Sequence, residues 1–254
     1  MKGSTVSLAL LAMFCSGALA QSSVTLYGIV DANAQWNKRY STATDRQESV
    51  WSIDSGYQSG SRFGLRGAEA LGNGWAAIFT LEGGFDGSTG QSTQGGLLFG
   101  RQAWAGLQGG WGSVAAGRIP TPSSGTGSFD MFGAVDPFAA GFGINTIGST
   151  FVAANALRQD NAVLYVTPAL GGIKAAAGYS FNRSGGETAP QDSNSNALNL
   201  AASFAAGPFY AVVTYDRLGY PGAESATGNA GLPDEKLVQV GGTFDLTVVK
   251  LHAA

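Results

Sequence analysis

The feature that most constrains the fold is a long alternation of apolar and polar residues near the N-terminus. Between Ser23 and Trp36 the even-numbered positions are apolar or glycine, and the odd-numbered ones include Thr25, Asp31 and Asn33. Successive side chains of a β-strand point to opposite faces, so the pattern predicts a strand with one apolar face. Its length exceeds the ~5–6 residues usual for strands and suits a tilted strand that crosses a bilayer.

The same alternation returns along the chain and predicts eleven strands in all. Short turns, such as Leu71–Gly74 and Gly109–Gly110, alternate with longer loops, such as 37–59 and 87–96, a habit of outer-membrane barrels. If Arg101 and Arg118 point into a lumen, Gly100, Trp104, Trp111 and Ala115 are expected on the outer face. The ten further predicted strands are 60–70, 75–85, 97–108, 111–118, 158–167, 173–182, 198–204, 209–216, 238–244 and one that begins near 247.

Composition excludes several classes of protein. Charged residues make up 12% of the chain, against about 25% in typical domains, and no apolar run of 18 residues follows the N-terminus. A helical membrane protein is therefore excluded. A formal net charge of −3 gives no electrostatic case for nucleic acid.

The first twenty residues predict a signal peptide. Lys2 precedes an apolar run from Val6 to Phe14, and Ala18–Ala20 fits a small-residue cleavage site, so the mature domain is expected to span residues 21–254. Cys15 raises the alternative of a lipoprotein, which the bulky Phe14 before it disfavours. Cleavage after Ala20 removes the single cysteine, so no disulfide is expected.

Two all-β folds compete, a soluble sandwich and a transmembrane antiparallel β-barrel. Long strands, loops of alternating length and aromatic residues at strand ends favour the barrel, with its apolar face toward lipid. Bacterial single-chain barrels have even strand numbers. Eleven predicted strands therefore suggest about the first 11 of 16, in a domain that is incomplete at its C-terminus.

One stretch, Arg118 to Thr150, does not alternate. It is rich in Gly, Phe and Pro and carries two carboxylates, Asp130 and Asp136. Long loops without secondary structure are uncommon in compact domains and are usually functional. We expect this loop to fold into the lumen, with Phe129, Phe132 and Phe138 anchoring it to the wall.

Several motifs make the chain resemble the general porins of β-proteobacterial type. The resemblance implies a sixteen-stranded, trimeric outer-membrane channel whose third external loop folds inward. Members of that family end in a strand with a terminal aromatic residue, and Ala254 departs from this pattern. The motifs are Ser23–Gly28, Ser61–Gly67 with Leu71–Gly74, Phe99–Gln102, Gly117–Arg118, Arg158–Tyr165, Gly207–Pro208 and Phe244–Asp245 with Val248–Lys250.

The resemblance also implies a charged pore constriction. The basic wall would consist of Arg62, Arg101, Arg118 and Arg158, and the acidic side would come from Asp130 and Asp136 on the loop. Other interpretations stay open: Arg62 and Arg66 also suit the headgroup layer, and Asp136 before Pro137 also suits a turn. Glu82, Asp86 and Asp31 are candidates for further lumen charge, at a depth that the pattern leaves undetermined.

The expected function is general diffusion of small hydrophilic solutes and ions across the outer membrane. No Ser-His-Asp set, metal cluster or acid pair stands out, so neither an enzyme nor a cofactor or metal is expected. Expected partners are outer-membrane lipid and two further copies of the chain, and no nucleic acid. The alternatives are a substrate-specific channel, which needs aromatic residues or a binding site along the lumen, and a barrel that serves as an adhesin or structural membrane protein.

Overall fold

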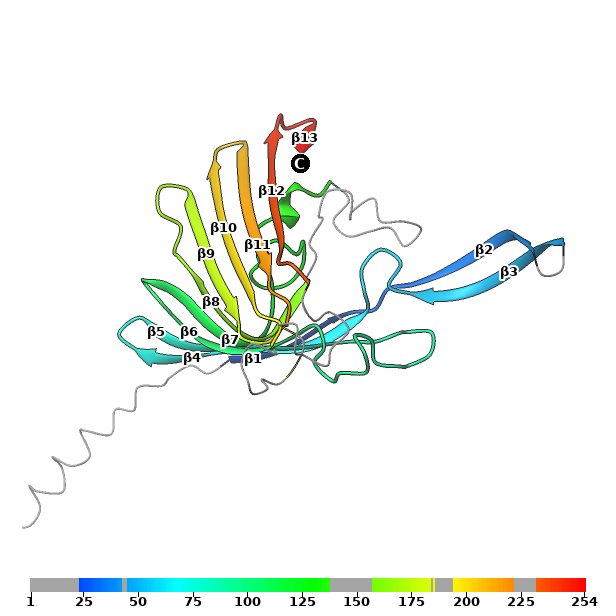
Figure 1. The fold of residues 1–254 in the computed structure, drawn as a ribbon, viewed down its shortest axis with the longest axis horizontal. Helices are drawn as coiled ribbons and strands as arrows, with labels where there is room; N and C mark the ends of the chain where they lie inside the picture. The colour runs from blue at the N-terminus through cyan, green and yellow to red at the C-terminus, as the bar shows by residue number, and fades with distance from the viewer. Residues whose placement is uncertain (1–22, 43–44, 138–156, 184, 186–193, 222–231) are drawn as a thin grey trace, which may run out of the picture.

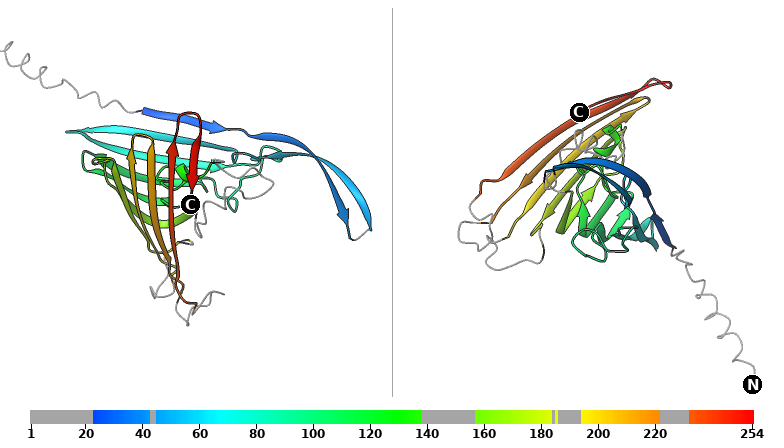
Figure 2. Two further views of the ribbon diagram at one scale, coloured as in Figure 1. Left: turned by 90° about the horizontal axis from the view of Figure 1, so that it is seen from above. Right: turned by 90° about the vertical axis from the view of Figure 1, so that its right-hand side faces the viewer.

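The structure, a computed structural model, describes residues 23–42, 45–137, 157–183, 185, 194–221 and 232–254. The predicted signal peptide lies outside the described residues. Eleven strands form one antiparallel sheet that curves, so that one of its faces is concave (Figures 1 and 2). In spatial order they are β1 (Ser23–Ile29), β4 (Arg62–Gly72), β5 (Trp75–Gly84), β6 (Gln102–Gly109), β7 (Gly112–Pro120), β8 (Arg158–Val166), β9 (Ile173–Ser180), β10 (Ala197–Ala206), β11 (Phe209–Leu218), β12 (Glu235–Asp245) and β13 (Lys250–Ala253).

The prediction of an all-β antiparallel wall is confirmed, and consecutive wall strands pair as neighbours. On β11, Val213 is 43% exposed on the convex face while Val212 is 3% exposed on the concave face. On β10, Leu200 is exposed and its neighbour Asn199 is buried. The exposed apolar side chains of these strands, such as Leu200 and Val213, therefore point outward, as a lipid-facing wall requires, whereas Val212 is buried on the concave face. In the described part of the chain, no helix has the length and apolar character needed to cross a membrane.

The first predicted strand is wrong in its extent. The segment 23–36 divides at Val30–Asp31 into β1 and β2 (Ala32–Ser41), and β2 pairs with β3 (Arg46–Ser55) in a separate two-stranded ribbon. Much of the predicted loop 37–59 is therefore a β-hairpin that projects beyond the wall (Figure 1). Alternation continues through both strands because it reports an extended backbone, whereas the break reflects a change of partner from β4 to β3.

Asp31 holds the chain at this change of partner. Its carboxylate accepts hydrogen bonds from the backbone N–H groups of Gln58 and Ser59, at 2.9 and 2.6 Å. Its backbone carbonyl accepts a further bond from the N–H of Gly56, at 3.0 Å. These bonds tie the two ends of the hairpin together at the level where it leaves the sheet.

The concave face is not uniformly polar. A buried apolar cluster joins Leu164, Val166 and Val212 on the wall to Phe132 and Val135 on the connection between β7 and β8. Val135 is the last residue of a short 3₁₀ turn, η1 (Gly133–Val135), and Phe132 directly precedes this turn. The described part of this connection, residues 121–137, is therefore packed inside the curve of the sheet.

The predicted facing of β6 and β7 is wrong at two positions. Trp104 is only 7% exposed and lies on the concave face, and Ala115 is also buried there. The indole of Trp104 packs on Phe129 of the inward connection, with ring centroids 4.8 Å apart. An apolar side chain on the lumen side thus marks where the loop docks, and alternation alone assigns such a residue to the lipid side.

Candidate functional site

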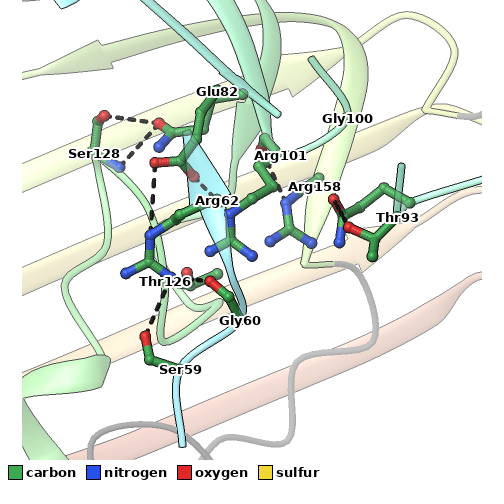
Figure 3. A network of polar contacts seen from close by, with 12 residues as sticks. Ser59, Gly60, Arg62, Glu82, Thr93, Gly100, Arg101, Thr126, Ser128 and Arg158 are labelled. Atoms are coloured by element: carbon green, nitrogen blue, oxygen red, sulfur yellow. Dashed lines mark hydrogen bonds and ion pairs between the residues drawn. The ribbon is translucent and has the colours of Figure 1, made fainter. Parts of the chain in front are cut away.

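Four arginines gather where wall strands meet the long connections. Arg62 begins β4, Arg101 immediately precedes β6, Arg118 lies near the end of β7 and Arg158 begins β8. The guanidinium groups of Arg62, Arg101 and Arg158 lie one after another along the wall (Figure 3). The structure therefore brings the four predicted basic residues to one level of the sheet.

Glu82 of β5 is the carboxylate at the centre of this cluster. Its Oε1 accepts a hydrogen bond from Nε of Arg101 at 2.7 Å, and its Oε2 lies 3.9 Å from Nε of Arg62. The hydroxyl of Tyr27 donates to the same Oε2 at 2.9 Å. With its side chain only 6% exposed, Glu82 is held between three neighbouring strands rather than free in the lumen.

Backbone carbonyls orient the other two arginines. Nε of Arg158 donates to the carbonyl of Arg101 at 2.9 Å, and Nε of Arg118 donates to the carbonyl of Gly100 at 2.8 Å. Arg118 also forms an ion pair with Asp160. Four guanidinium groups thus face two carboxylates, Glu82 and Asp160, and the cluster keeps an excess of positive charge.

A glycine allows the backbone geometry beside Arg118. The register of β7 against β8 shifts between Gly117 and Ile119, around Arg118 itself. Gly117 has a φ of +136°, a conformation that L side chains rarely adopt, and a Cβ there would lie 2.2 Å from the carbonyl oxygen of Ala103. The Gly117–Arg118 pair is therefore a structural unit in which glycine permits the irregularity.

The inward connection is bound to the wall at both sides of the lumen. The amide and hydroxyl of Ser128 donate to Oε1 of Gln102, at 3.1 and 2.7 Å. On the far side, the hydroxyl of Tyr210 donates to the carbonyl of Met131, and Nδ1 of His252 lies 2.8 Å from the carbonyl oxygen of Val135. The predicted anchoring roles of Phe129 and Phe132 are confirmed, while Phe138 lies outside the described residues.

The two predicted loop carboxylates both lie on the inward connection. Asp130 accepts hydrogen bonds from the backbone N–H groups of Gly125, Phe132 and Gly133, at 2.9 to 3.2 Å, so its carboxylate closes the loop on itself. Burial raises the pKa of Asp130, against the opposing effect of these amide bonds. Asp136 caps η1, where its backbone N–H donates to the carbonyl of Gly133. That either carboxylate faces the arginines stays a prediction.

Sequence reasoning placed Glu82 on the polar face of its strand but did not identify it as the partner of the arginines. The order of the strands contained a signal: Glu82 lies on β5, between β4, which begins at Arg62, and β6, which follows Arg101. Glu82 pairs with Gly64 of β4 on one side and with Gln102 of β6 on the other, so the segments that carry Arg62 and Arg101 both lie beside it. A cation-rich wall of this kind attracts anions and orients dipolar solutes. Among the described residues, no three His, Cys, Asp or Glu side chains form a group able to hold a metal ion.

The chain is similar to known proteins in sequence and in fold. A family model described as Gram-negative porin matches residues 7–254. An outer membrane porin protein of Bordetella pertussis is 38% identical over 274 residues, covering 100% of this chain and 69% of that relative. Outer membrane porin protein 32 of Delftia acidovorans is 33% identical over 261 residues, covering 99% of this chain and 68% of that relative. Among solved structures, an anion-selective porin from Comamonas acidovorans is similar with a TM-score of 0.67 and 28% identity, covering 90% of this chain and 65% of that one.

Proposed function

The chain belongs to the Gram-negative porin family, and from this premise we propose that it works as a passive channel for small hydrophilic solutes and ions, with a preference for anions. The family consists of channels of the outer membrane rather than enzymes. The chain spans about two thirds of the length of the porins that it matches. Its transport activity, its solutes and its assembly are therefore parts of the proposal.

One observation carries the anion preference: four arginines converge on the concave wall against two carboxylates. The terminal nitrogens of Arg158 have no hydrogen-bond acceptor among the described residues, while its Nε is fixed by the carbonyl of Arg101. A fixed cation in a narrow, water-filled passage attracts anions more strongly than one in open solution, because less water screens it. The description of the similar solved porin as anion-selective agrees with this expectation.

The inward connection supports a constriction at the level of the arginines. Ser128 is bonded to Gln102, and the residue before Gln102 is Arg101, which itself contacts Glu82. We propose that residues 121–137 narrow the lumen beside the basic wall. Asp130 and Asp136 keep their proposed role as the acidic side of this passage.

Reconstitution in planar lipid bilayers tests the proposed function. We expect stepwise conductance and, in a salt gradient, a reversal potential whose sign shows anion preference. Absence of conductance steps would overturn the channel, and a reversal potential on the cation side would overturn the selectivity alone.

We also propose that the channel is a homotrimer. Support comes from the β2–β3 hairpin, on which Trp36 pairs with Trp51 and Ala34 pairs with Ile53 on one face. Trp51 is 76% exposed and Ile53 is 62% exposed. Isolated two-stranded hairpins are marginally stable in water, so an uncovered aromatic face favours contact with a neighbouring copy.

A further inference from the structure

Arg66 is an exposed cation on the concave face of β4, outside the cluster of four arginines. Successive side chains of a strand alternate in direction, so Arg66 shares the face of Arg62 and Gly64. It pairs with Thr80 of β5, which is 5% exposed, and Thr80 pairs in turn with Trp104 on the lumen side. The sequence pattern suits both the headgroup layer and the lumen for Arg66, and this pairing favours the lumen.

Arg66 is separated from the cluster along the strand. It follows Arg62 by four residues, or about 13 Å of extended backbone. It lies toward Gly72, where β4 ends at the short turn into β5, whereas Arg62 begins the strand at its other end. The lumen wall therefore carries a fixed cation on the short-turn side of the arginine cluster.

An aromatic ring from the neighbouring strand supports the guanidinium group of Arg66. Tyr27 of β1 pairs with Gly64, and a Cβ at Gly64 would lie 2.8 Å from both Cζ and the hydroxyl oxygen of Tyr27. The ring therefore fills the space over Gly64, between the positions of Arg62 and Arg66 on β4. Cζ of Arg66 lies 5.3 Å from the centre of this ring, within the range of a cation–π contact. The Tyr27 hydroxyl donates to Glu82 at 2.9 Å, so the ring that supports Arg66 is itself fixed.

The charge of Arg66 is not compensated nearby. Among the residues that the structure describes, no carboxylate forms an ion pair with Arg66. Glu82 is engaged by two arginines of the cluster, and Glu69 lies on the opposite face of β4. The partners of Arg66 across the strands are Thr25 and Thr80, which carry no charge. An anion in the lumen therefore meets an uncompensated guanidinium group at this level.

We propose that Arg66 forms a second anion-attracting step of the channel, on the short-turn side of the arginine cluster, and that Tyr27 positions it. The ligands are small inorganic anions such as chloride, which are attracted by charge rather than by shape. A fixed charge on one side of a narrow passage raises the local concentration of counter-ions on that side. The channel therefore conducts unequally in the two directions at low salt. The inference rests on the proposed function, because it concerns ions that pass through the same lumen.

A thiol placed beside Arg66 measures the local electrostatic potential without any need for conductance. Thr25→Cys introduces this thiol at the cross-strand partner of Arg66, and the single native cysteine lies at position 15, in the predicted signal peptide. Two methanethiosulfonate reagents, one with a sulfonate and one with a trimethylammonium group, react with the folded protein in detergent, and their rates are expressed as a ratio. In about 0.1 M salt, Arg66→Gln is expected to lower the ratio of sulfonate to trimethylammonium rate by about threefold to fivefold.

High salt supplies an internal test of this result. In about 1 M salt the Debye length falls to about 3 Å, so the ratios with and without Arg66→Gln are expected to agree. A ratio that Arg66→Gln leaves unchanged in low salt would overturn the anion-attracting step. A difference that persists unchanged in high salt would also overturn it, because the cause would not be a screened charge.

Three variants in the Thr25→Cys background separate the charge from its support. Arg46→Gln on the β2–β3 hairpin is the matched control and is expected to leave the ratio unchanged. Tyr27→Phe keeps the ring and is expected to preserve the ratio, while Tyr27→Leu removes the ring and is expected to lower it about twofold. An equal fall in Arg46→Gln would contradict a local effect. Equal ratios in Tyr27→Phe and Tyr27→Leu would overturn the positioning role of the ring.

Planar-bilayer recording connects the step to transport and separates it from the proposed function. With channels inserted in one orientation in about 0.1 M potassium chloride, more current is expected when the voltage drives chloride in from the short-turn side, and Arg66→Gln is expected to reduce this excess about twofold. An excess that Arg66→Gln leaves unchanged, in a protein that conducts, would overturn the step and leave the porin function intact. A thiol ratio that responds to Arg66→Gln, in a protein without conductance, would support the anion-attracting position of Arg66 and overturn the channel.

Discussion

At the scale of single residues, Arg158 and Glu82 are expected to act on selectivity in opposite directions. Arg158 contributes a guanidinium group whose terminal nitrogens have no described acceptor, and Glu82 contributes the carboxylate that partly neutralises Arg62 and Arg101. Both lie in the same cluster, so their substitutions probe one electrostatic field.

Arg158→Glu changes the charge at the cluster by two units. Two unit charges about 4 Å apart in water interact by about 1 kcal/mol, which is a factor of about five, so the ratio of anion to cation permeability is expected to fall at least about fivefold. Arg101→Glu is expected to shift it in the same direction. Reversal potentials in a salt gradient measure the shift. Arg46→Glu, the same charge change on the distant hairpin, is the control, and an equal shift there would rule out a local effect.

Glu82→Gln removes a negative charge and keeps an amide oxygen for Arg101. The reversal potential is expected to move further toward anions, opposite to the Arg158→Glu shift. The free energy of unfolding is expected to fall by about 1–3 kcal/mol, because buried Arg101 loses its charged partner. Circular dichroism measures the unfolding, and Glu69→Gln on β4 is the control. Unchanged selectivity would show that Glu82 does not influence the field in the pore.

At the scale of elements, the inward connection depends on contacts from strands far away in the chain. Tyr210 on β11 donates its hydroxyl to the carbonyl of Met131, across 79 positions of sequence. A typical hydrogen bond contributes about 0.5–1.5 kcal/mol, so losing this one is expected to loosen the loop without unfolding the wall.

Tyr210→Phe is therefore expected to increase fluctuations of the open-channel current. The melting temperature of the protein is expected to change little. Single-channel recording measures the fluctuations. Tyr215→Phe removes a hydroxyl from the same strand on the opposite face and is the matched control. Equal current noise in the two variants would contradict an anchoring role for the Tyr210 hydroxyl.

The base of the β2–β3 hairpin is expected to respond to acid. Backbone amide bonds, that from Ser59 first, lower the pKa of Asp31. A lowered carboxyl pKa stabilises the folded form above the ordinary value of about 3.9, and this contribution is lost as pH falls through the lower value of the folded protein. At neutral pH the Asp31 carboxylate is thus expected to hold residues 56–60 by its hydrogen bonds, and in acid these bonds are expected to be lost.

A fluorophore attached at Tyr57→Cys reports this release, since the single cysteine of the chain lies at position 15, in the predicted signal peptide. Fluorescence anisotropy is expected to fall as pH drops below about 4. In Asp31→Asn it is expected to be low at every pH. A pH-dependent fall that persists in Asp31→Asn would assign the response to another group.

At the scale of the whole molecule, assembly is expected to depend on the aromatic face of the hairpin. The double variant Trp36→Ser, Trp51→Ser removes the paired rings, whose centroids are 6.1 Å apart. Fewer oligomers are expected to survive on unheated SDS gels, with light scattering as a second measure. Gln35→Ser on the opposite face is the control. Oligomers that resist SDS as well as those of the unmodified chain would show that this face makes no essential contact between copies.

Much of the wall follows from local sequence, and the reason is physical. A strand with lipid on one side and water on the other must alternate, so β9, β10 and β11 are visible as patterns before any partner is known. The assignment of the four arginines to one basic wall came instead from the resemblance, through the motifs in which they stand. Trp104 was not predictable in this way, because an apolar side chain that packs on an inward loop gives the same sequence pattern as one that faces lipid.

The sequence by itself therefore determined an alternating antiparallel wall, its turns and an irregular inward connection, and its motifs carried the resemblance that implied four clustered arginines. Only the tertiary structure decided that Glu82 pairs with the arginines, that Asp130 closes its own loop and that residues 32–55 leave the wall as a hairpin. The division has one cause. Alternation records the environment on each side of a strand, while partners depend on register between segments that lie tens of residues apart.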